Sequence, residues 1–215
     1  MRATGRAVGD FSNPRSGEAL ASRSSDEELS RLQWTWLRQV HGAEVVVVKR
    51  PRDSCGSRAD AAVTASAGAG LVVLTADCAP VALSSLEGVV GIAHAGWRGL
   101  LGGVVEEAVS AMRRLGASQV FAALGPCIHA HAYAFSPEDL EPLVARLGPG
   151  VRGVDENEGP ALDLPAAVAA ALARAGAELF AVAGTCTHCS QEHWSWRARR
   201  ESGRQATVVW KPVAT

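Results

Sequence analysis

Runs of consecutive apolar residues begin near residue 44 and predict buried strands. The β-branched run 44–49 (EVVVVK) is typical of a strand, as are 71–75 (LVVLT) and 89–93 (VVGIA). Unbroken apolar runs of this kind indicate strands buried on both faces. Shorter runs predict further strands at 120–124, 179–183 and 207–210.

Helical spacing follows in two stretches. After Gly99 the apolar positions recur every three or four residues as far as Met112, with Glu106 and Arg113 among the polar ones. Residues 163–174 form an alanine-rich helix with a proline in its first turn, where proline is tolerated. Strands and helices alternate without an internal repeat or a linker, so the pattern predicts one mixed domain of strands and helices.

The beginning of the chain differs from the rest. Residues 1–32 are polar, with scattered Gly, Pro, Ser and Arg and no sustained apolar period. We predict a surface segment there that contributes little chemistry, followed by a single catalytic domain over 33–215.

Composition narrows the class of protein. The chain has 215 residues, 47% of them hydrophobic, and a net charge of -1, which favours a small-molecule ligand over nucleic acid or an anionic membrane. The longest uncharged stretch, 61–76, is shorter than a membrane span, and no signal-peptide pattern opens the sequence. Five cysteines are an odd number in a chain too large to need disulfides. We therefore expect a cytoplasmic protein whose thiols are ligands, nucleophiles or core residues.

Three reactive side chains stand where predicted strands begin or end. His41 precedes 44–49, Cys78 follows 71–75, and His94 follows 89–93. Two imidazoles and a thiolate suit zinc, and three protein ligands leave the fourth tetrahedral position open, as in catalytic sites. The separations along the chain are too long for a zinc finger. From the residues alone, a metal site and three unrelated side chains both stay open.

The segment HAGWRG (94–99) joins a strand to a helix and could bind an anion. Gly96 permits close approach, Trp97 offers an aromatic face, and the Arg98 guanidinium could pair with phosphate at the helix start. The alternative is an ordinary turn with a solvated arginine.

Three weaker signals remain. Cys186 and Cys189 have the CxxC spacing of redox or metal pairs, but the chain has only one such pair, so we favour a buried cysteine with a tolerated neighbour over a second metal site. His129 and His131 are more typical of loop histidines than of copper ligands. The arginine-rich segment 195–204 suits an anionic substrate or internal salt bridges better than nucleic acid.

Taken in order, five motifs resemble the YfiH/YlmD family, also called the laccase-domain or polyphenol-oxidase family. The motifs are QVHG (39–42), TADC (75–78), HAGWRG (94–99), GPCI (125–128) and SWRARRESGR (195–204). The resemblance implies an α+β fold with mixed β-sheets flanked by helices, like the catalytic domain of cytotoxic necrotizing factors. It also implies zinc, or less plausibly copper, held by His41, Cys78 and His94.

The resemblance further implies purine nucleoside phosphorolysis, with adenosine, inosine, guanosine or methylthioadenosine and phosphate as substrates, and adenosine deamination as a second activity. From the residues themselves, Cys78, His94 and Asp77 are the catalytic candidates, and Gly96, Trp97 and Arg98 are the candidates for binding substrate and phosphate. Asp60 is another acid/base candidate, although for both Asp77 and Asp60 a supporting or capping role is the more typical one. The sequence indicates no oligomeric state.

The chain also departs from the family pattern. An SLNLG-like motif is not evident before Leu32, and Ala132 and Ala134 stand where the family commonly has a cysteine and a glutamate. Three other functions therefore stay open: a metal-free hydrolase using Cys78 and His94, a copper-dependent polyphenol oxidase, and a nucleoside-binding protein without turnover.

Overall fold

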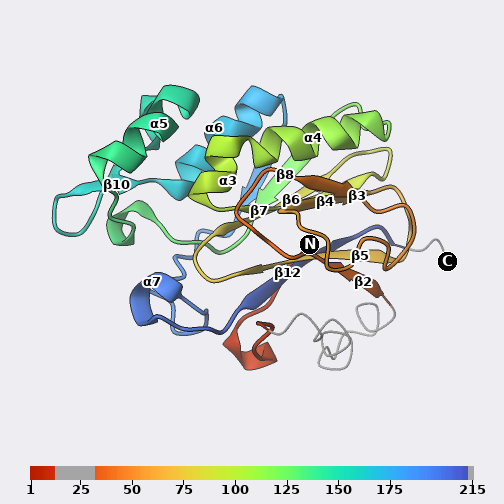
Figure 1. Cartoon of the computed structure of the whole chain (residues 1–215), viewed down its shortest axis with the longest axis horizontal. Coiled ribbons are helices and arrows are strands. Elements are labelled where there is room, and N and C mark those ends of the chain that lie inside the picture. Colours follow the sequence, from red (N-terminus) through yellow and green to blue (C-terminus); the bar gives the residue numbers. More distant parts are fainter. Residues whose placement is uncertain (13–31, 213–215) are drawn as a thin grey trace.

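The computed structural model describes residues 1–12 and 32–212. Figure 1 shows three layers: helices on top, a six-stranded sheet beneath them, and a four-stranded sheet below. This is an α+β fold with mixed sheets, as the sequence predicts. Within the described residues, no helix is long and apolar enough to cross a membrane.

The six-stranded sheet has the order β11-β8-β6-β7-β4-β3. Its central strands pair antiparallel, whereas β11 with β8 and β3 with β4 pair parallel at the two edges. The strands are β3 (Val45–Val47), β4 (Ala61–Thr64), β6 (Ala79–Ser84), β7 (Val90–Ala95), β8 (Phe121–Leu124) and β11 (Glu178–Val182). All of β7 is buried, because helices cover one face and the second sheet covers the other.

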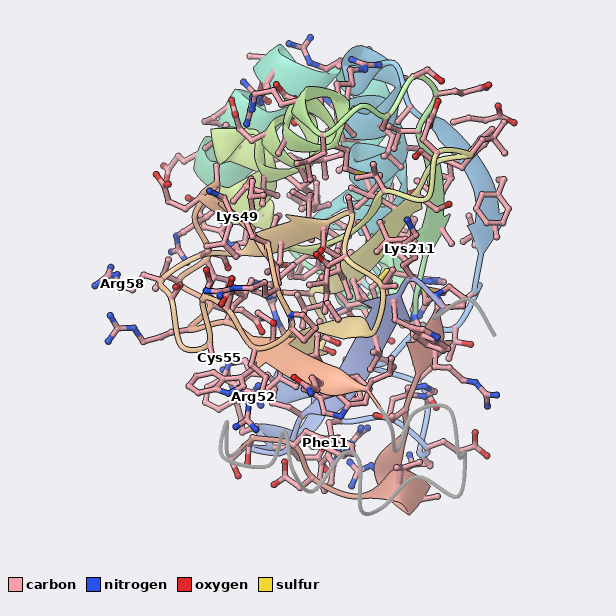
Figure 2. All side chains as sticks on the ribbon, turned by 90° about the vertical axis from the view of Figure 1, so that its right-hand side faces the viewer. Phe11, Lys49, Arg52, Cys55, Arg58 and Lys211 are labelled. Carbon is pink, nitrogen blue, oxygen red and sulfur yellow. The ribbon has the colours of Figure 1, made fainter. Side chains whose placement is uncertain are left out.

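The four-stranded sheet has the order β1-β12-β5-β2. Its strands are β1 (Arg2–Ala3), β2 (Gln33–Trp36), β5 (Ala69–Thr75) and β12 (Gln205–Trp210). Phe11 is buried on the outer face of this sheet, away from the helices (Figure 2). The first twelve residues thus pack against the chain's last strand. The rest of the predicted N-terminal segment, 13–31, lies outside the described residues, so a domain boundary at residue 32 stays a prediction.

Helices cover the upper face of the six-stranded sheet. They are α3 (Trp97–Gly102), α4 (Val104–Arg114), α5 (Pro137–Leu147) and α6 (Leu164–Ala175). The Asp163 carboxylate caps α6 by accepting a hydrogen bond from the Ala166 N–H at 2.9 Å, which fixes the predicted start of that helix. A short helix, α7 (Trp196–Arg199), lies at the lower left of Figure 1.

Smaller elements join these layers. They are the 3-10 turns η1 (Arg6–Val8), η3 (Ala130–Ala132) and η4 (Pro149–Val151), and the antiparallel pair β9 (Arg152–Val154) and β10 (Pro160–Leu162). η3 and its neighbours carry side chains to the edge of the candidate site.

Two predictions about boundaries are corrected. The helix expected after Gly99 is two helices, because it begins at Trp97 and Gly103 breaks it with a left-handed φ of 89°. His94 does not follow its strand but lies inside β7. The chain therefore turns into α3 directly after His94 and Ala95.

Candidate metal centre and its cavity

The structure brings His41, Cys78 and His94 together. Their ligand atoms all lie within 4.8 Å of one another. His41 comes from the loop before β3, Cys78 from the turn between β5 and β6, and His94 from β7. Three separate segments of the chain therefore meet beside the C-terminal end of the central strand β7, and the three residues lie together as the resemblance implies.

Asp60 holds two of these segments in place. Its buried carboxylate accepts hydrogen bonds from the N–H groups of His41 at 2.9 Å and Gly42 at 2.8 Å, and another from Val40. His41 has a φ of 58°, which a residue with a side chain rarely adopts. The bonds to Asp60 compensate that backbone and aim the imidazole at the cluster.

The same carboxylate orients His94. Asp60 Oδ1 lies 2.8 Å from His94 Nδ1, which leaves Nε2 to face Cys78 and His41. Burial raises the pKa of Asp60, but the hydrogen bonds from His94 and from the backbone outweigh it and lower the pKa below its usual value. A carboxylate that fixes the second nitrogen of a histidine is the usual partner of a metal ligand.

Cys78 is set up as a thiolate. Burial raises its pKa, but the charge of His94 and hydrogen bonds from both histidines lower the pKa to about 6. Burial lowers the pKa of His94, but the charge of Cys78 and the hydrogen bond to Asp60 raise it to about 9. Thiolate is the form in which cysteine binds a metal, whereas the His94 imidazole would have to release a proton for its nitrogen to bind one.

The donor set fits a metal ion. Ligands at the usual zinc distances stand roughly 3.3 to 3.8 Å apart in a tetrahedron, and the three donor atoms lie within 4.8 Å. Gly96 borders the cluster: a Cβ built there would lie 3.0 Å from Cys78 Sγ and 3.0 Å from a carbon of the His41 ring. The cluster could thus hold a metal ion, and its closeness leaves no room for a larger residue at position 96.

A cavity of about 580 Å³ opens over the cluster. That volume is within the range of small-molecule sites. Its lining residues are Ser12, Leu37, Gln39, His41, Leu74, Thr75, Ala76, Asp77, Cys78, His94, Trp97, Arg98, Tyr133, Trp196, Arg197 and Arg204. The His41, Cys78 and His94 cluster therefore shares one cavity with three arginines and three large aromatic side chains.

Two of the arginines lie on aromatic rings. The Arg98 guanidinium is 4.3 Å from the Trp97 ring centre, and that of Arg197 is 4.8 Å from the ring of Tyr133. Trp97 is itself braced edge-on by Phe135. These contacts hold two positive charges at the cavity wall, and Trp97 and Arg98 both line the cavity, while their role in binding substrate stays a prediction.

Asp77 lines the cavity, but both of its carboxylate oxygens already accept hydrogen bonds. One oxygen accepts a hydrogen bond from Thr187 Oγ1 at 2.8 Å and the other accepts one from the Arg197 N–H at 2.6 Å. Its own backbone has a φ of 91°. These bonds favour a supporting role, in which Asp77 ties α7 to the turn that carries Cys78.

Some lining residues were not singled out from the sequence. Gln39 pairs its amide with the backbone of Leu74 on both sides, at 2.7 and 2.8 Å, and so joins the QVHG loop to β5. Tyr133 follows GPCI in a stretch that diverges from the family pattern. Arg197 and Arg204 belong to the basic segment 195–204, whose density of arginine was the available signal, whereas Tyr133 gave none.

Residues from two of the weaker sequence signals, the histidine pair and the CxxC pair, also lie close together. His131 Nε2 lies 3.0 Å from Cys189 Sγ, and these two residues with Cys186 form a second group that could hold a metal ion. The sequence treated the histidine pair and the CxxC pair as unrelated and favoured a structural role for each. His129 contacts His131 through its ring and belongs to neither metal group of the described residues.

Fold and site together define a single-domain α+β protein with a His/Cys/His centre in an arginine-lined cavity. Residues 5–212 match the family model described as multi-copper polyphenol oxidoreductase laccase. The chain belongs to this laccase-domain family, which also includes the YfiH proteins.

Named relatives and a solved structure are similar to this chain over most of its length. The chain is 41% identical over 211 residues to a Streptomyces coelicolor protein named purine nucleoside phosphorylase, covering 96% of this chain and 86% of the relative. A Xylella fastidiosa protein of the same name is 40% identical over 186 residues, covering 81% and 71%. YlmD from Geobacillus stearothermophilus has a TM-score of 0.80 at 27% identity, covering 98% and 85%.

Proposed function

We propose that this chain is a metal-dependent purine nucleoside phosphorylase with Zn²⁺ bound by His41, Cys78 and His94. The observation that carries the proposal is the convergence of the three-ligand centre with arginine and aromatic side chains in one cavity. Relatives that cover most of the chain carry the name of this activity. Purine nucleoside and phosphate would be the substrates, with adenosine, inosine, guanosine and methylthioadenosine as candidates.

Phosphorolysis makes demands that these residues can meet. A phosphate oxygen forms a bond to the ribose C1′ while the C1′ bond to the purine breaks, and the departing base takes the electron pair and a proton. Arg98, at the cavity wall beside Trp97, would hold the phosphate against C1′. Trp97 and Tyr133 offer aromatic faces for the base.

The metal would supply positive charge in a partly buried site when it is bound. Asp60 would keep His94 in the orientation that ligation requires, and Asp77 would hold α7 and Arg197 at the cavity. We also propose adenosine deamination in the same cavity. In this reaction water replaces the amine at C6 and ammonia leaves. We favour zinc over copper because a multi-copper centre needs many histidines, and this chain has six.

A second candidate rests on a specific contact. A thiol, an imidazole and a carboxylate lie one after another in space: Cys78, His94 and Asp60. His94 Nδ1 is 2.8 Å from Asp60 Oδ1, and the pKa of Cys78 is lowered to about 6. That is also how a metal-free cysteine hydrolase activates its nucleophile. The two candidates differ in whether the protein needs a metal.

The deciding experiment combines elemental analysis with a chromatographic assay of adenosine and inosine, with and without phosphate. We expect zinc in the active protein and free base released only when phosphate is present. Cys78→Ala should lose the zinc of the cavity centre and the release of free base, whereas Cys55→Ala, at an exposed cysteine in the loop after β3 (Figure 2), should keep both. A metal-free protein with no purine turnover would favour the hydrolase, or a nucleoside-binding protein without catalysis.

Arg98→Ala tests the phosphate site. Losing the guanidinium should raise the KM for phosphate about tenfold or more while changing the KM for nucleoside less. Arg58→Ala, at an exposed arginine that does not line the cavity (Figure 2), is the matched control. Equal effects on both KM values would contradict the assignment of Arg98 to phosphate.

A further inference from the structure

A second group of soft ligands lies outside the cavity. His131 belongs to η3, and Cys186 and Cys189 belong to the loop after β11. Their three ligand atoms lie within 4.8 Å of one another, with His131 Nε2 3.0 Å from Cys189 Sγ. None of the three is among the residues that line the cavity.

Backbone hydrogen bonds, not the three side chains, bring these segments together. Cys127 N–H donates to the Thr185 carbonyl at 3.3 Å, and Thr187 N–H donates to the Cys127 carbonyl at 3.0 Å. Ser190 N–H closes the CxxC turn on the Cys186 carbonyl at 3.1 Å. The three donors are therefore placed beside one another by a scaffold that does not depend on them, which lowers the entropy lost when they bind a common ligand.

The chemistry of the donors selects the ligand. Two sulfurs and one imidazole nitrogen suit Zn²⁺ and exclude hard cations such as Mg²⁺ and Ca²⁺, which prefer oxygen. Cys189 and His131 are exposed, and Cys186 is partly buried, so an ion can reach the group and a water can complete a tetrahedron.

We propose that His131, Cys186 and Cys189 form a second metal site that binds Zn²⁺ independently of the centre in the cavity. Each thiol releases its proton to solvent as its sulfur binds the ion, so binding one Zn²⁺ frees two protons. The site links the loop that follows GPCI to the loop that precedes α7.

The location gives this ion a structural role. Thr187 lies between the two cysteines and donates to Asp77, the residue before Cys78. Tyr133, two residues after His131, forms part of the cavity wall. An ion at this site would therefore brace two walls of the cavity without touching substrate.

Counting metal ions in variants tests the proposal separately from the proposed function. The protein is purified under reducing conditions, dialysed against Zn²⁺ and analysed for zinc per chain. We expect two ions in the unaltered protein, one in Cys186→Ala/Cys189→Ala, one in Cys78→Ala, and two in the control Cys55→Ala. If the cavity centre holds no metal, Cys78→Ala still keeps the ion of the second site, so the two proposals fail differently.

Cobalt distinguishes the sites spectroscopically. Co²⁺ bound by thiolate gives a sulfur-to-metal charge-transfer absorption, which should persist in Cys78→Ala from two sulfurs and disappear when Cys186 and Cys189 are also replaced. His131→Ala, a milder change at an exposed residue, should weaken zinc binding in the Cys78→Ala background by about tenfold or more. Circular dichroism confirms that each variant is folded.

The proposal is overturned if Cys186→Ala/Cys189→Ala binds as much zinc as the unaltered protein. It is equally overturned if Cys78→Ala binds no zinc and shows no charge-transfer band with Co²⁺ while remaining folded. The absence of zinc and of the charge-transfer band in Cys78→Ala would follow if Cys186 and Cys189 stayed joined in a disulfide and the reduced protein also took up no zinc.

Discussion

Asp60 shows how one carboxylate can organise a whole centre. It is fully buried, and it accepts hydrogen bonds from three consecutive backbone N–H groups and faces His94 Nδ1. Every partner is a donor, so the site requires a group that only accepts. An amide of the same shape would turn at least one N–H toward another N–H.

We therefore expect Asp60→Asn to weaken zinc binding about 10- to 100-fold, the usual effect of losing a partner behind a metal ligand. Competition with a chromophoric chelator measures the affinity. Asp163→Asn is the matched control, because asparagine replaces aspartate well at the start of a helix. Unchanged affinity in Asp60→Asn would show that the backbone around His41 needs no carboxylate.

Gly96 is constrained by space and not by its backbone. Its φ of -81° and ψ of 165° suit any residue, but a methyl group would press on Cys78 Sγ and the His41 ring. Gly96→Ala should displace these ligands and reduce zinc affinity about tenfold, while the metal-free fold changes little. Gly150→Ala, where nothing lies within 4 Å, should bind zinc normally. Metal titration of both variants decides the point.

At the scale of elements, the arginine-rich segment divides its charges between the cavity and the fold. Arg197 and Arg204 line the cavity, whereas Arg199 forms an ion pair with Glu201 at 3.1 Å. Glu201 also pairs with Arg6 and accepts a hydrogen bond from the Ser195 N–H. One carboxylate thus joins the beginning of the chain to the start of α7.

The titration of Glu201 makes this link measurable. Partial burial raises its pKa, but the Arg6 hydrogen bond, the Ser195 N–H and Arg199 lower it to about 2. Because its pKa is lower in the folded state, ionised Glu201 stabilises the fold at pH values above the pKa of the unfolded chain, near 4.3. This stabilisation is lost as the pH falls toward 2.

Glu201→Gln should therefore lower the free energy of unfolding by about 1 kcal/mol at pH 7, and the difference should shrink between pH 5 and pH 3. Urea unfolding at several pH values measures it. Glu138→Gln, in the exposed first turn of α5, serves as a comparison. A constant difference at every pH would mean that charge plays no part in the contact.

For the whole molecule, the two sheets share one core layer. Leu71 of β5 is fully buried there, in the same cluster as Ile92 of β7 and Val209 of β12. Because this layer joins the sheets, we expect them to unfold together rather than one after the other.

Leu71→Ala should lower the free energy of unfolding by about 2 to 5 kcal/mol, through lost burial and the cavity left behind. Circular dichroism and the fluorescence of the chain's six tryptophans, two of which lie in β2, should give the same transition. Leu86→Ala, with the side chain 86% exposed, should change it by less than about 0.5 kcal/mol. Separate transitions would contradict a shared core.

The sequence alone determined much of the secondary structure and the identity of the three candidate ligands. Periodicity located β5, β7, β12 and α6, because burial on two faces or on one helical stripe leaves a local pattern. It did not locate β4 and β6 as separate strands, since short alanine-rich runs are equally consistent with turns.

Only the tertiary structure decided which residues meet. Periodicity is local, whereas the contacts of Asp60, the approach of Gly96 to Cys78, and the meeting of His131 with the CxxC pair join separate segments of the chain. The motifs could name the cavity's ligands through a family resemblance. The second metal group has no such motif, because its histidine and cysteines are brought together by backbone pairing between loops.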